Sequence, residues 1–529
     1  MGTATRTSMA ATTSGGRPPE SEDAGLGASA TAPADRELRG DVDTGKARAV
    51  LWLCLSAGFI TLLDQSVFIL AVPAMASDLE AGAAEVQWIL ASYSLAFGIA
   101  LVPSGRLGDL LGRRALFVTG ILVFGVFSLV GGLTSAPWLV IVARLLQGLG
   151  AGCLNPQVLG LLQDRFTGAE RAKALGYYAA AGGSAAVCGP LIGGVILSAA
   201  GPNTGWRLLF LANVPLVLVL VPLAIKLLPK GKAAESQPVE TTRRRTSVDA
   251  LGALLLGAVV TTFLVPTVYG TQGASALWLA AGPASILCFA AWEFLYHRRG
   301  RTPLLSPELV RSKGYLLGTV VALCQFGVGA AMAALTAFYF LSGTGLAPLA
   351  AAAILAPQAA GMLLASSLSW RFLGRFGRAG VVLALAASLA TLIAKDLAVQ
   401  GLDDAAAAVV VAAVGLVQGV TTGLVVAPNQ ALTLGHAPTG AAGVAAGFYQ
   451  LSQRFSAALC SAAIAGLFLN ALPDTGFRAA FRDGIILCMA LTAAAILAGA
   501  VDWLRVAAAK RSAPIVSNLP SSNRTKEIQ

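Results

Sequence analysis

Glycines and charged residues alternate in the stretch Gly105-Arg106-Leu107-Gly108-Asp109-Leu110-Leu111-Gly112-Arg113-Arg114, which joins two long apolar runs. The runs lie near 87–105 and 115–134, and roughly 20 mostly apolar residues suffice to cross a bilayer as a helix. Glycine permits a tight turn between such helices, and Asp109 can pair with the neighbouring arginines or cap the following helix. The stretch therefore predicts a charged loop between two membrane spans.

Apolar runs of this length recur along the whole chain. Of the 529 residues, 56% are hydrophobic and 12% are charged, whereas a soluble domain carries about 25% charged residues. Fourteen runs can be distinguished, near 48–72, 87–105, 115–134, 138–161, 173–198, 207–228, 248–270, 276–296, 315–341, 349–369, 379–395, 405–432, 441–469 and 484–506. The sequence therefore predicts an all-α polytopic membrane protein with 14 transmembrane helices.

The positions of the positive charges indicate the topology, because cytoplasmic loops of membrane proteins are rich in Lys and Arg. With the N-terminus in the cytoplasm, the cytoplasmic segments hold all of the 37 lysines and arginines except Arg207, Lys395, Arg478 and Arg482 in outside loops, and Arg144 and Arg454 within spans. This bias predicts a multi-pass protein of a bacterial cell membrane with both termini cytoplasmic. The net charge of +11 then follows from topology, which argues against a nucleic-acid partner.

The runs and the segments between them predict seven regions. Residues 1–46 are rich in Ala, Thr, Ser, Gly and Pro, a composition typical of a disordered cytoplasmic tail. The further regions are a six-helix bundle at 47–228, a cytoplasmic linker at 229–247, two extra transmembrane helices at 248–296, a cytoplasmic loop at 297–314, a second six-helix bundle at 315–506 and a cytoplasmic tail at 507–529.

A second charged stretch indicates that the two bundles are related. In Arg371-Phe372-Leu373-Gly374-Arg375-Phe376-Gly377-Arg378, an arginine is followed by five residues and then by Gly-Arg, as in the first stretch from Arg106 to Arg113. Repeated halves are common in secondary transporters. The position of the echo, after the second span of each bundle, fits such a repeat.

Polar or small residues also form motifs inside the predicted spans. Asp64 is the only carboxylate deep within a predicted span, and a buried carboxylate can load and release a proton. Charged groups within spans are costly and mark functional sites by default. The motifs are Leu62-Leu63-Asp64-Gln65-Ser66-Val67, Arg144-Leu145-Leu146-Gln147-Gly148-Leu149-Gly150, Gly189-Pro190-Leu191-Ile192-Gly193-Gly194 and Trp206-Arg207-Leu208-Leu209-Phe210-Leu211-Ala212-Asn213-Val214-Pro215.

Together these motifs resemble those of the major facilitator superfamily and, within it, the fourteen-span drug:proton antiporters. The resemblance covers about residues 48–506 and implies the major facilitator fold, with two six-helix bundles around a central cavity and two extra helices at the periphery. It implies proton coupling at Asp64 and Arg144. It also implies a gating latch of Gly105, Arg106, Asp109, Gly112, Arg113 and Arg114, and an antiporter motif of Gly189, Pro190, Gly193 and Gly194.

Each motif also has a purely structural interpretation. The latch could be an ordinary basic loop, and the segment from Gly189 to Gly194 could be a packing seam between helices. Asp64 and Arg144 could form a structural ion pair, or Asp64 could lie outside the first span if its boundary is shifted. Trp206 is expected to be an interfacial aromatic.

Side chains expected at the substrate cavity from their span positions are Gln147, Gln325, Phe326, Tyr339, Gln358, Asn429, Tyr449, Gln450 and Arg454, although each could equally be a packing residue. The chain departs from the family at Ile69, where Asn is usual, and at Gln453-Arg454, where Arg-Gln is usual. The spans at 315–341 and 349–369 contain no acid, whereas family members that export divalent cations tend to have one. We therefore expect monovalent, neutral or weakly acidic substrates.

The sequence thus predicts a proton-coupled antiporter that exports drugs, antibiotics or secondary metabolites by alternating access. Its expected partners are the substrate, protons and the bilayer, and we expect a monomer. No cofactor or metal site is expected, because the seven cysteines lie in apolar runs and the two histidines lie far apart. A metabolite importer or symporter on the same fold, a membrane-embedded enzyme and a nontransporting receptor are the alternatives. The Gly189–Gly194 motif argues against the importer, and the lack of clustered acids or histidines argues against the enzyme.

Overall fold

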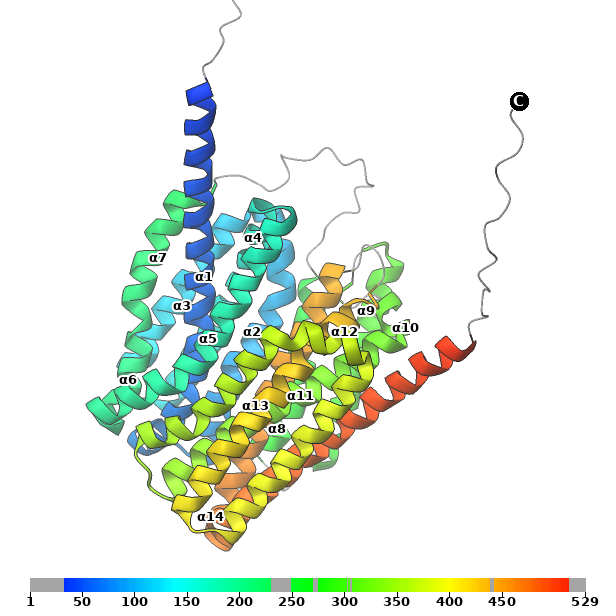
Figure 1. The fold of residues 1–529 in the computed structure, drawn as a ribbon. Coiled ribbons are helices and arrows are strands. Elements are labelled where there is room, and N and C mark those ends of the chain that lie inside the picture. The colour runs from blue at the N-terminus through cyan, green and yellow to red at the C-terminus, as the bar shows by residue number, and fades with distance from the viewer. Residues whose placement is uncertain are drawn as a thin grey trace, which may run out of the picture. The chain divides into compact units, whose positions relative to one another are not determined.

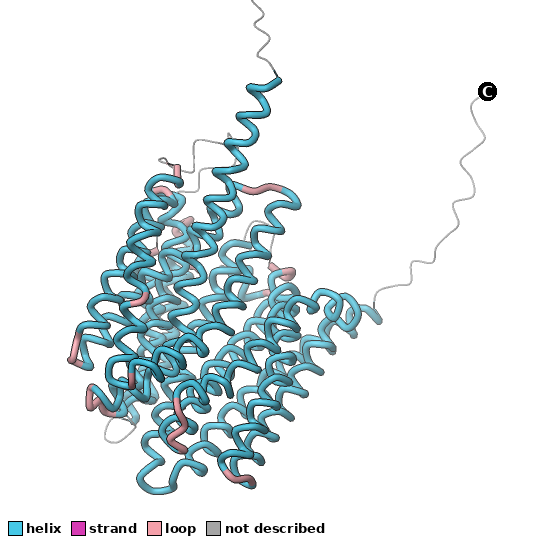
Figure 2. Tube along the Cα trace, turned by 60° about the vertical axis from the view of Figure 1, so that its left-hand side comes forward, coloured by secondary structure: helices cyan, strands magenta, loops and turns pink. Residues whose placement is uncertain are grey.

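The computed structural model describes residues 33–229, 249–269, 275–301, 303–304, 307–437 and 442–512. In this part of the chain the regular structure is entirely helical, with short connecting loops (Figures 1 and 2). The helices are α1 (Pro33–Asp78), α2 (Ala83–Leu111), α3 (Arg113–Leu133), α4 (Pro137–Arg165), α5 (Gly168–Ala200), α6 (Pro202–Leu211), α7 (Asn213–Leu227), α8 (Ala250–Tyr269), α9 (Ser275–Arg298), α10 (Pro307–Arg311), α11 (Lys313–Ala337), the π-helical turn η2 (Phe338–Gly343), α12 (Pro348–Gly401), α13 (Asp404–Leu434) and α14 (Ala442–Ser512).

The chain divides into two units, residues 1–46 and residues 47–529. The division coincides with the predicted start of the first bundle. Within the first unit, residues 33–46 are helical, whereas the composition indicates a tail without regular structure. Residues 1–32 lie outside the described part of the chain, so the rest of that prediction stays a prediction.

Twelve helices of the described residues are long and apolar enough to cross a membrane. They include every predicted span of the two six-helix bundles, so the protein is a multi-pass membrane protein. α8 and α9 occupy the predicted positions of the two extra spans, but they do not belong to these twelve. The count of 14 spans therefore rests on the sequence.

Two of the long helices each contain two spans. α12 is broken at Gly377, where φ is 53°, and α14 is broken at Gly476, where φ is 77°. Glycine adopts this left-handed region without the steric cost that a Cβ imposes. The predicted boundaries between these spans are thus confirmed, with a single glycine making each turn.

Buried apolar residues join the two halves at one end of the spans. One cluster combines Phe68, Ile89 and Trp206 of the first half with Tyr339 and Phe468 of the second. This end lies away from the stretch 105–114. Two other clusters each belong to one half: one is formed by α1 to α5 with α7, and the other by α11 to α14.

The pair α8 and α9 packs beside this junction. The two helices pack on each other, and α8 contacts α2 of the first half and α14 of the second. Ile99 of α2 lies 3.0 Å from the position that a Cβ at Gly257 would occupy. The pair therefore lies along the seam between α2 and α14, which fits the predicted peripheral position.

Candidate functional site

Asp64 lies at the centre of a buried polar cluster in the first half. Its Oδ2 atom is 2.6 Å from Nη1 of Arg144 on α4, and its Oδ1 atom accepts a hydrogen bond of 2.8 Å from Asn213 on α7. The exposed fractions of the Arg144 and Asp64 side chains are only 3% and 4%. The predicted ion pair therefore exists, inside the first half, and Asp64 lies well within the first span.

Neutral groups complete this cluster. Arg144 also donates to Gln147 at 3.2 Å, and Gln147 donates to Ser128 on α3 at 2.6 Å. The Arg144 guanidinium lies 3.7 Å from the ring centre of Phe68 and 4.4 Å from that of Tyr93, in the range of cation–π attraction. A buried ion pair is tolerated only where such additional partners offset the desolvation of both charges.

Gln147 and Asn213 have other roles in this cluster than the sequence predicts. Gln147 was expected at the substrate cavity, but it is completely buried and holds Arg144 in place. Asn213 stands in the motif that begins at Trp206, but it is not among the predicted site residues. A polar residue in an apolar run was the available signal for Asn213, and only the fold shows that it meets Asp64.

The predicted latch is mostly helical, which corrects the expectation of a loop. α2 continues through Gly105 and Gly108 to Leu111, and only Gly112, with φ of 95°, makes the turn. Gly108 instead allows α4 to approach, because a Cβ there would overlap the side chain of Gln157. Gln157 donates to the carbonyl oxygen of Ser104 at 2.8 Å, which fixes this contact.

The charged residues of the latch have different environments. Arg113 Nε lies 2.7 Å from Asp164 Oδ2 at the end of α4, and Arg114 is half-buried in the first turn of α3. Arg106 donates to the carbonyl oxygen of Pro303 at 3.0 Å. The side chain of Asp109 is outside the described part of the structure.

Arg106 links α2 to the peripheral helix pair. Burial lowers the pKa of its guanidinium, while Tyr296, Asp249 and Glu293 lie close enough to raise this pKa. Asp249 and Glu293 are both buried. The tip of α2 is therefore held electrostatically by the residues that precede α8 and end α9.

The antiporter motif of α5 has two packing faces. A Cβ at Gly189 would overlap Ser66 of α1, and one at Gly193 would lie 3.2 Å from Val67. Gly194 faces the other half, where an added Cβ would lie 2.7 Å from the Cβ of Ala352 on α12. Pro190 is buried between these glycines. Gly194 thus packs against a helix of the other half, whereas Gly189 and Gly193 pack within their own half.

A second buried network lies in the C-terminal half. Arg378 Nε is 2.5 Å from Asp502 Oδ2, and Nη1 of Arg378 donates to Asn429 at 2.5 Å. Asn429 donates to the hydroxyl of Tyr449 at 3.1 Å and to the carbonyl oxygen of Gly318 at 2.8 Å. Asn429 and Tyr449, both expected at the cavity, are thus buried parts of this network.

The sequence echo is also a structural one. Gly112 and Gly377 both adopt positive φ, and each is followed by an arginine, Arg113 or Arg378, that pairs with an aspartate of its own half. The sequence echo includes Arg378, but its partner Asp502 is not among the predicted site residues. Asp502 stands near the end of the predicted last span and is buried.

Lys395 corrects the predicted topology. It was assigned to an outside loop, but the span continues to Gly401, and Lys395 is 2% exposed. Its ammonium donates to Gln418 at 2.5 Å and to Gln358 at 3.3 Å. The signal was ambiguous, because a lysine that follows an apolar run can end a span or lie inside one. Gln358, expected at the cavity, is half-buried beside it.

The remaining predicted cavity residues do not form one cluster. Gln325 is buried and donates to Thr422 at 3.2 Å, and Phe326 and Gln450 are half-buried. Tyr339 is buried in η2 and donates to Asp404 at the start of α13. Tyr339 therefore lies in the apolar packing at one end of the spans, away from the middle of the membrane.

Arg454 is the predicted cavity residue that connects the two halves. Its Nη1 atom donates to Gln65 Oε1 of α1 at 2.6 Å, and its guanidinium lies 4.4 Å from the ring centre of Phe97 on α2. Gln65 in turn donates to Ser94 at 3.2 Å. The side chain of Arg454 is only half-buried, so it stays accessible between the halves.

Trp206 differs from the expectation of an interfacial aromatic. It is completely buried, and its indole nitrogen donates to Asp78 at the end of α1 at 3.0 Å. Arg207 Nη2 lies 3.1 Å from the same carboxylate oxygen. The motif thus ties α6 to the end of α1, and after Ala212 it places Asn213 at the start of α7, beside Asp64.

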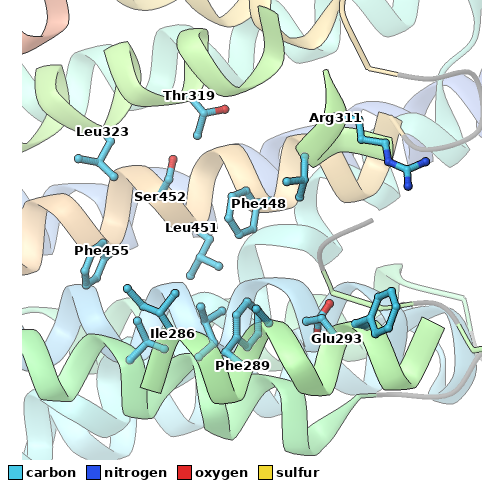
Figure 3. A pocket seen from close by; sticks show the side chains of 15 residues that line it. Ile286, Phe289, Glu293, Arg311, Thr319, Leu323, Phe448, Leu451, Ser452 and Phe455 are labelled. Carbon is cyan, nitrogen blue, oxygen red and sulfur yellow. The ribbon is translucent and has the colours of Figure 1, made fainter. Parts of the chain in front are cut away.

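A cavity of about 580 Å³ lies between the peripheral pair and the C-terminal half (Figure 3). Ile286 and Phe289 of α9 face Leu451 and Phe455 of α14 across it. Its lining is almost wholly apolar, and Glu293 brings a carboxylate to it. The cavity is separate from the Asp64 cluster, none of whose residues line it.

Comparison with known proteins identifies the family. The sequence profile described as Major Facilitator Superfamily matches residues 54–461. The chain belongs to the major facilitator superfamily. Solved structures agree on the fold: a bacterial homologue of the human drug peptide transporters PepT1 and PepT2 has a TM-score of 0.60 at 17% identity, covering 89% of this chain and 99% of its own.

Individual relatives are antibiotic and drug transporters by name. A protein described as a probable actinorhodin transporter of Streptomyces coelicolor is 34% identical over 71% of this chain. The alignment spans 65% of that protein, just under two thirds of its length. The puromycin resistance protein pur8 of Streptomyces alboniger is 34% identical over 65% of this chain and 67% of its own. The drug efflux pump JefA of Mycobacterium tuberculosis is 30% identical over 79% of this chain and 80% of its own. The resemblance to the drug-efflux branch is thereby confirmed.

Proposed function

We propose that the protein is a fourteen-span proton-coupled antiporter that exports small organic molecules from the cytoplasm by alternating access. α8 and α9 would be the two spans beyond the twelve, and both termini would be cytoplasmic. The names of the relatives support export of antibiotics or related metabolites. The observation that carries the proton-coupled part of the proposal is Asp64, a buried carboxylate held by Arg144 at 2.6 Å and by Asn213 at 2.8 Å.

This arrangement gives Asp64 two alternative states. As a carboxylate it is stabilised by Arg144 and Asn213, and protonation would weaken its attraction to Arg144. A proton on Asp64 therefore changes the contacts between α1, α4 and α7, which is the local event that alternating access requires. Each proton that crosses with net charge supplies about 2.3 kcal/mol per 100 mV of membrane potential.

The packing of the halves supports a conformation that is closed at one end. Apolar residues of both halves share one cluster at the end away from Gly112, and Gly194 packs against α12 there. With the latch on the cytoplasmic side, this is a state closed to the outside. The contacts of Arg106 with the peripheral pair would then lie on the cytoplasmic side of the protein.

Dye accumulation in efflux-deficient cells tests the proposal. Cells would express wild type or Asp64→Asn, with and without a protonophore. Lower accumulation with wild type alone, abolished by the protonophore, supports proton-coupled export through Asp64. Higher accumulation in cells that express wild type than in cells that do not express the protein would instead indicate an importer. Equal export by the variant would remove Asp64 from the coupling mechanism.

A further inference from the structure

Arg454 is half-buried between the two halves and differs from the two fully buried arginines. Arg144 is paired with Asp64, and Arg378 is paired with Asp502. In the described part of the chain, the Arg454 guanidinium donates a hydrogen bond to a neutral group, the Oε1 atom of Gln65. A desolvated cation is stabilised strongly only by an anion or by several oriented dipoles.

The surroundings of Arg454 are aromatic. Phe97 lies beneath its guanidinium at 4.4 Å, and the hydroxyls of Tyr93 and Tyr178 are close enough to interact with it electrostatically. Tyr178 is itself held by Asn155, which donates to its hydroxyl at 2.7 Å. The rings come from α2 and α5 of the first half, while the cation comes from α14 of the second.

The position of Arg454 links it to the movement between halves. Gly98 of α2 lies against it, with an added Cβ 3.2 Å from the Cβ of Arg454. Gln65, its hydrogen-bond acceptor, directly follows Asp64 in α1. A ligand bound to Arg454 would therefore contact both halves. It would also lie near Gln65, the residue that follows the proposed proton carrier Asp64.

We propose that Arg454 binds the anionic group of the transported substrate, so that the substrates include aromatic organic anions. This inference rests on the proposed function and specifies the substrate class. A guanidinium has five donors in a planar fork that matches a carboxylate, and Gln65 occupies one of them. The carboxylate of the substrate accepts from the free edge of Arg454, and an aromatic ring of the substrate packs against the half-buried Tyr178.

Lys395 provides the matched control. It is a buried cation whose hydrogen bonds, like that of Arg454, go to neutral groups, here Gln358 and Gln418. Both partners belong to the C-terminal half, so Lys395 does not connect the halves. If a buried charge alone determined anion binding, substitution of either cation would have the same effect.

Direct binding tests the inference independently of transport. The purified full-length protein would be titrated in detergent with carboxyfluorescein as the anionic aromatic probe and with ethidium as the cationic one. Arg454→Gln is expected to weaken carboxyfluorescein binding roughly 10-fold or more, as for loss of a charged hydrogen bond, and to leave ethidium binding unchanged. Arg454→Lys is expected to weaken it less, and Lys395→Gln is expected to keep the preference between the probes.

Three results would overturn the inference. Wild type that does not bind carboxyfluorescein, Arg454→Gln that binds it as wild type does, or an equal loss for both probes would each assign Arg454 a structural role. Proton-driven flux of carboxyfluorescein in vesicles tests the proposed function separately. Absence of that flux with intact carboxyfluorescein binding would reject antiport and keep the anion site.

Discussion

Asp64 and Gln65, consecutive residues of α1, hold arginines from opposite halves of the protein. Asp64 is 2.6 Å from Arg144 of the first half, and Gln65 is 2.6 Å from Arg454 of the second. Because both contacts depend on the same turn of α1, a change in one can alter the geometry of the other. This relationship places the proposed proton site beside the junction of the halves.

Asn213 is expected to support the carboxylate of Asp64. Asn213→Leu removes the 2.8 Å hydrogen bond to Oδ1 and leaves a buried acceptor without that donor, which typically costs about 1–3 kcal/mol. We expect lower thermal stability and reduced proton-dependent export. The control is Asn203→Leu at the exposed start of α6, which should change neither. Equal stability of the two variants would contradict the structural role of Asn213.

The Arg378–Asp502 pair is expected to matter far more for stability than an exposed pair. Asp502→Ala leaves Arg378 buried without its carboxylate, which costs about 3–5 kcal/mol in buried pairs. Arg478→Ala breaks the exposed Arg478–Asp404 pair, leaves the hydrogen bond from Tyr339 to Asp404 in place and should cost about 1 kcal/mol or less.

Thermal unfolding of the purified variants gives the comparison. The double variant Arg378→Met with Asp502→Leu should recover much of the loss, because it removes both buried charges. If Asp502→Ala and Arg478→Ala unfold at the same temperature, the buried network is not a stabilising element.

Gly112 should not accept a side chain without strain. Its φ of 95° lies in a region that L-residues rarely adopt, so Gly112→Ala is expected to destabilise the protein by about 1–2 kcal/mol. Gly176→Ala is the control, because Gly176 is helical and has no atom within 4 Å of an added Cβ. Unfolding temperatures that rank the two variants in the opposite order would refute the strained turn.

Gly194 is expected to control closure at the end away from the latch. A Cβ there would lie 3.0 Å from the backbone of Leu349 and Pro348, which cannot move aside as a side chain can. Gly194→Ala should therefore separate α5 from α12 at this end and reduce export. Gly329→Ala in α11, where an added Cβ has open space, is the control.

Cross-linking can measure this closure. In a background without the seven native cysteines, Ser198→Cys and Leu349→Cys would report the contact in which Ser198 Oγ accepts from the backbone nitrogen of Leu349 at 3.1 Å. The cross-link should form readily with Gly194 and less often with Gly194→Ala. An unchanged cross-linking yield would show that Gly194 is not a determinant of closure.

The spans were predictable because a lipid environment restricts the backbone. A segment in a bilayer must satisfy its own hydrogen bonds, so a long apolar run has essentially one solution, a helix. The turns at Gly377 and Gly476 followed from interruptions of those runs. The family motifs also placed Asp64 and Arg144 within spans, and their pairing was one of the expected alternatives.

The side-chain partners were less predictable, because they depend on contacts between distant segments. Asp64 contacts Asn213, and Arg378 contacts Asp502, only after the helices pack. Neither contact can be inferred from composition or from motif spacing. Gly108 shows a second limit: glycine serves both turns and close helix contacts, and the sequence does not distinguish them. Lys395 shows a third, because a charge near the end of an apolar run does not reveal on which side of the boundary it lies.

The most direct test of proton coupling through Asp64 compares two activities of the purified protein in proteoliposomes. One is substrate accumulation driven by an imposed pH gradient, and the other is exchange of substrate across the membrane without a gradient. The structure predicts that Asp64→Asn keeps exchange, because Asn fills the same space, and that gradient-driven accumulation falls to the level of protein-free vesicles. Accumulation by Asp64→Asn at the wild-type level would contradict the account.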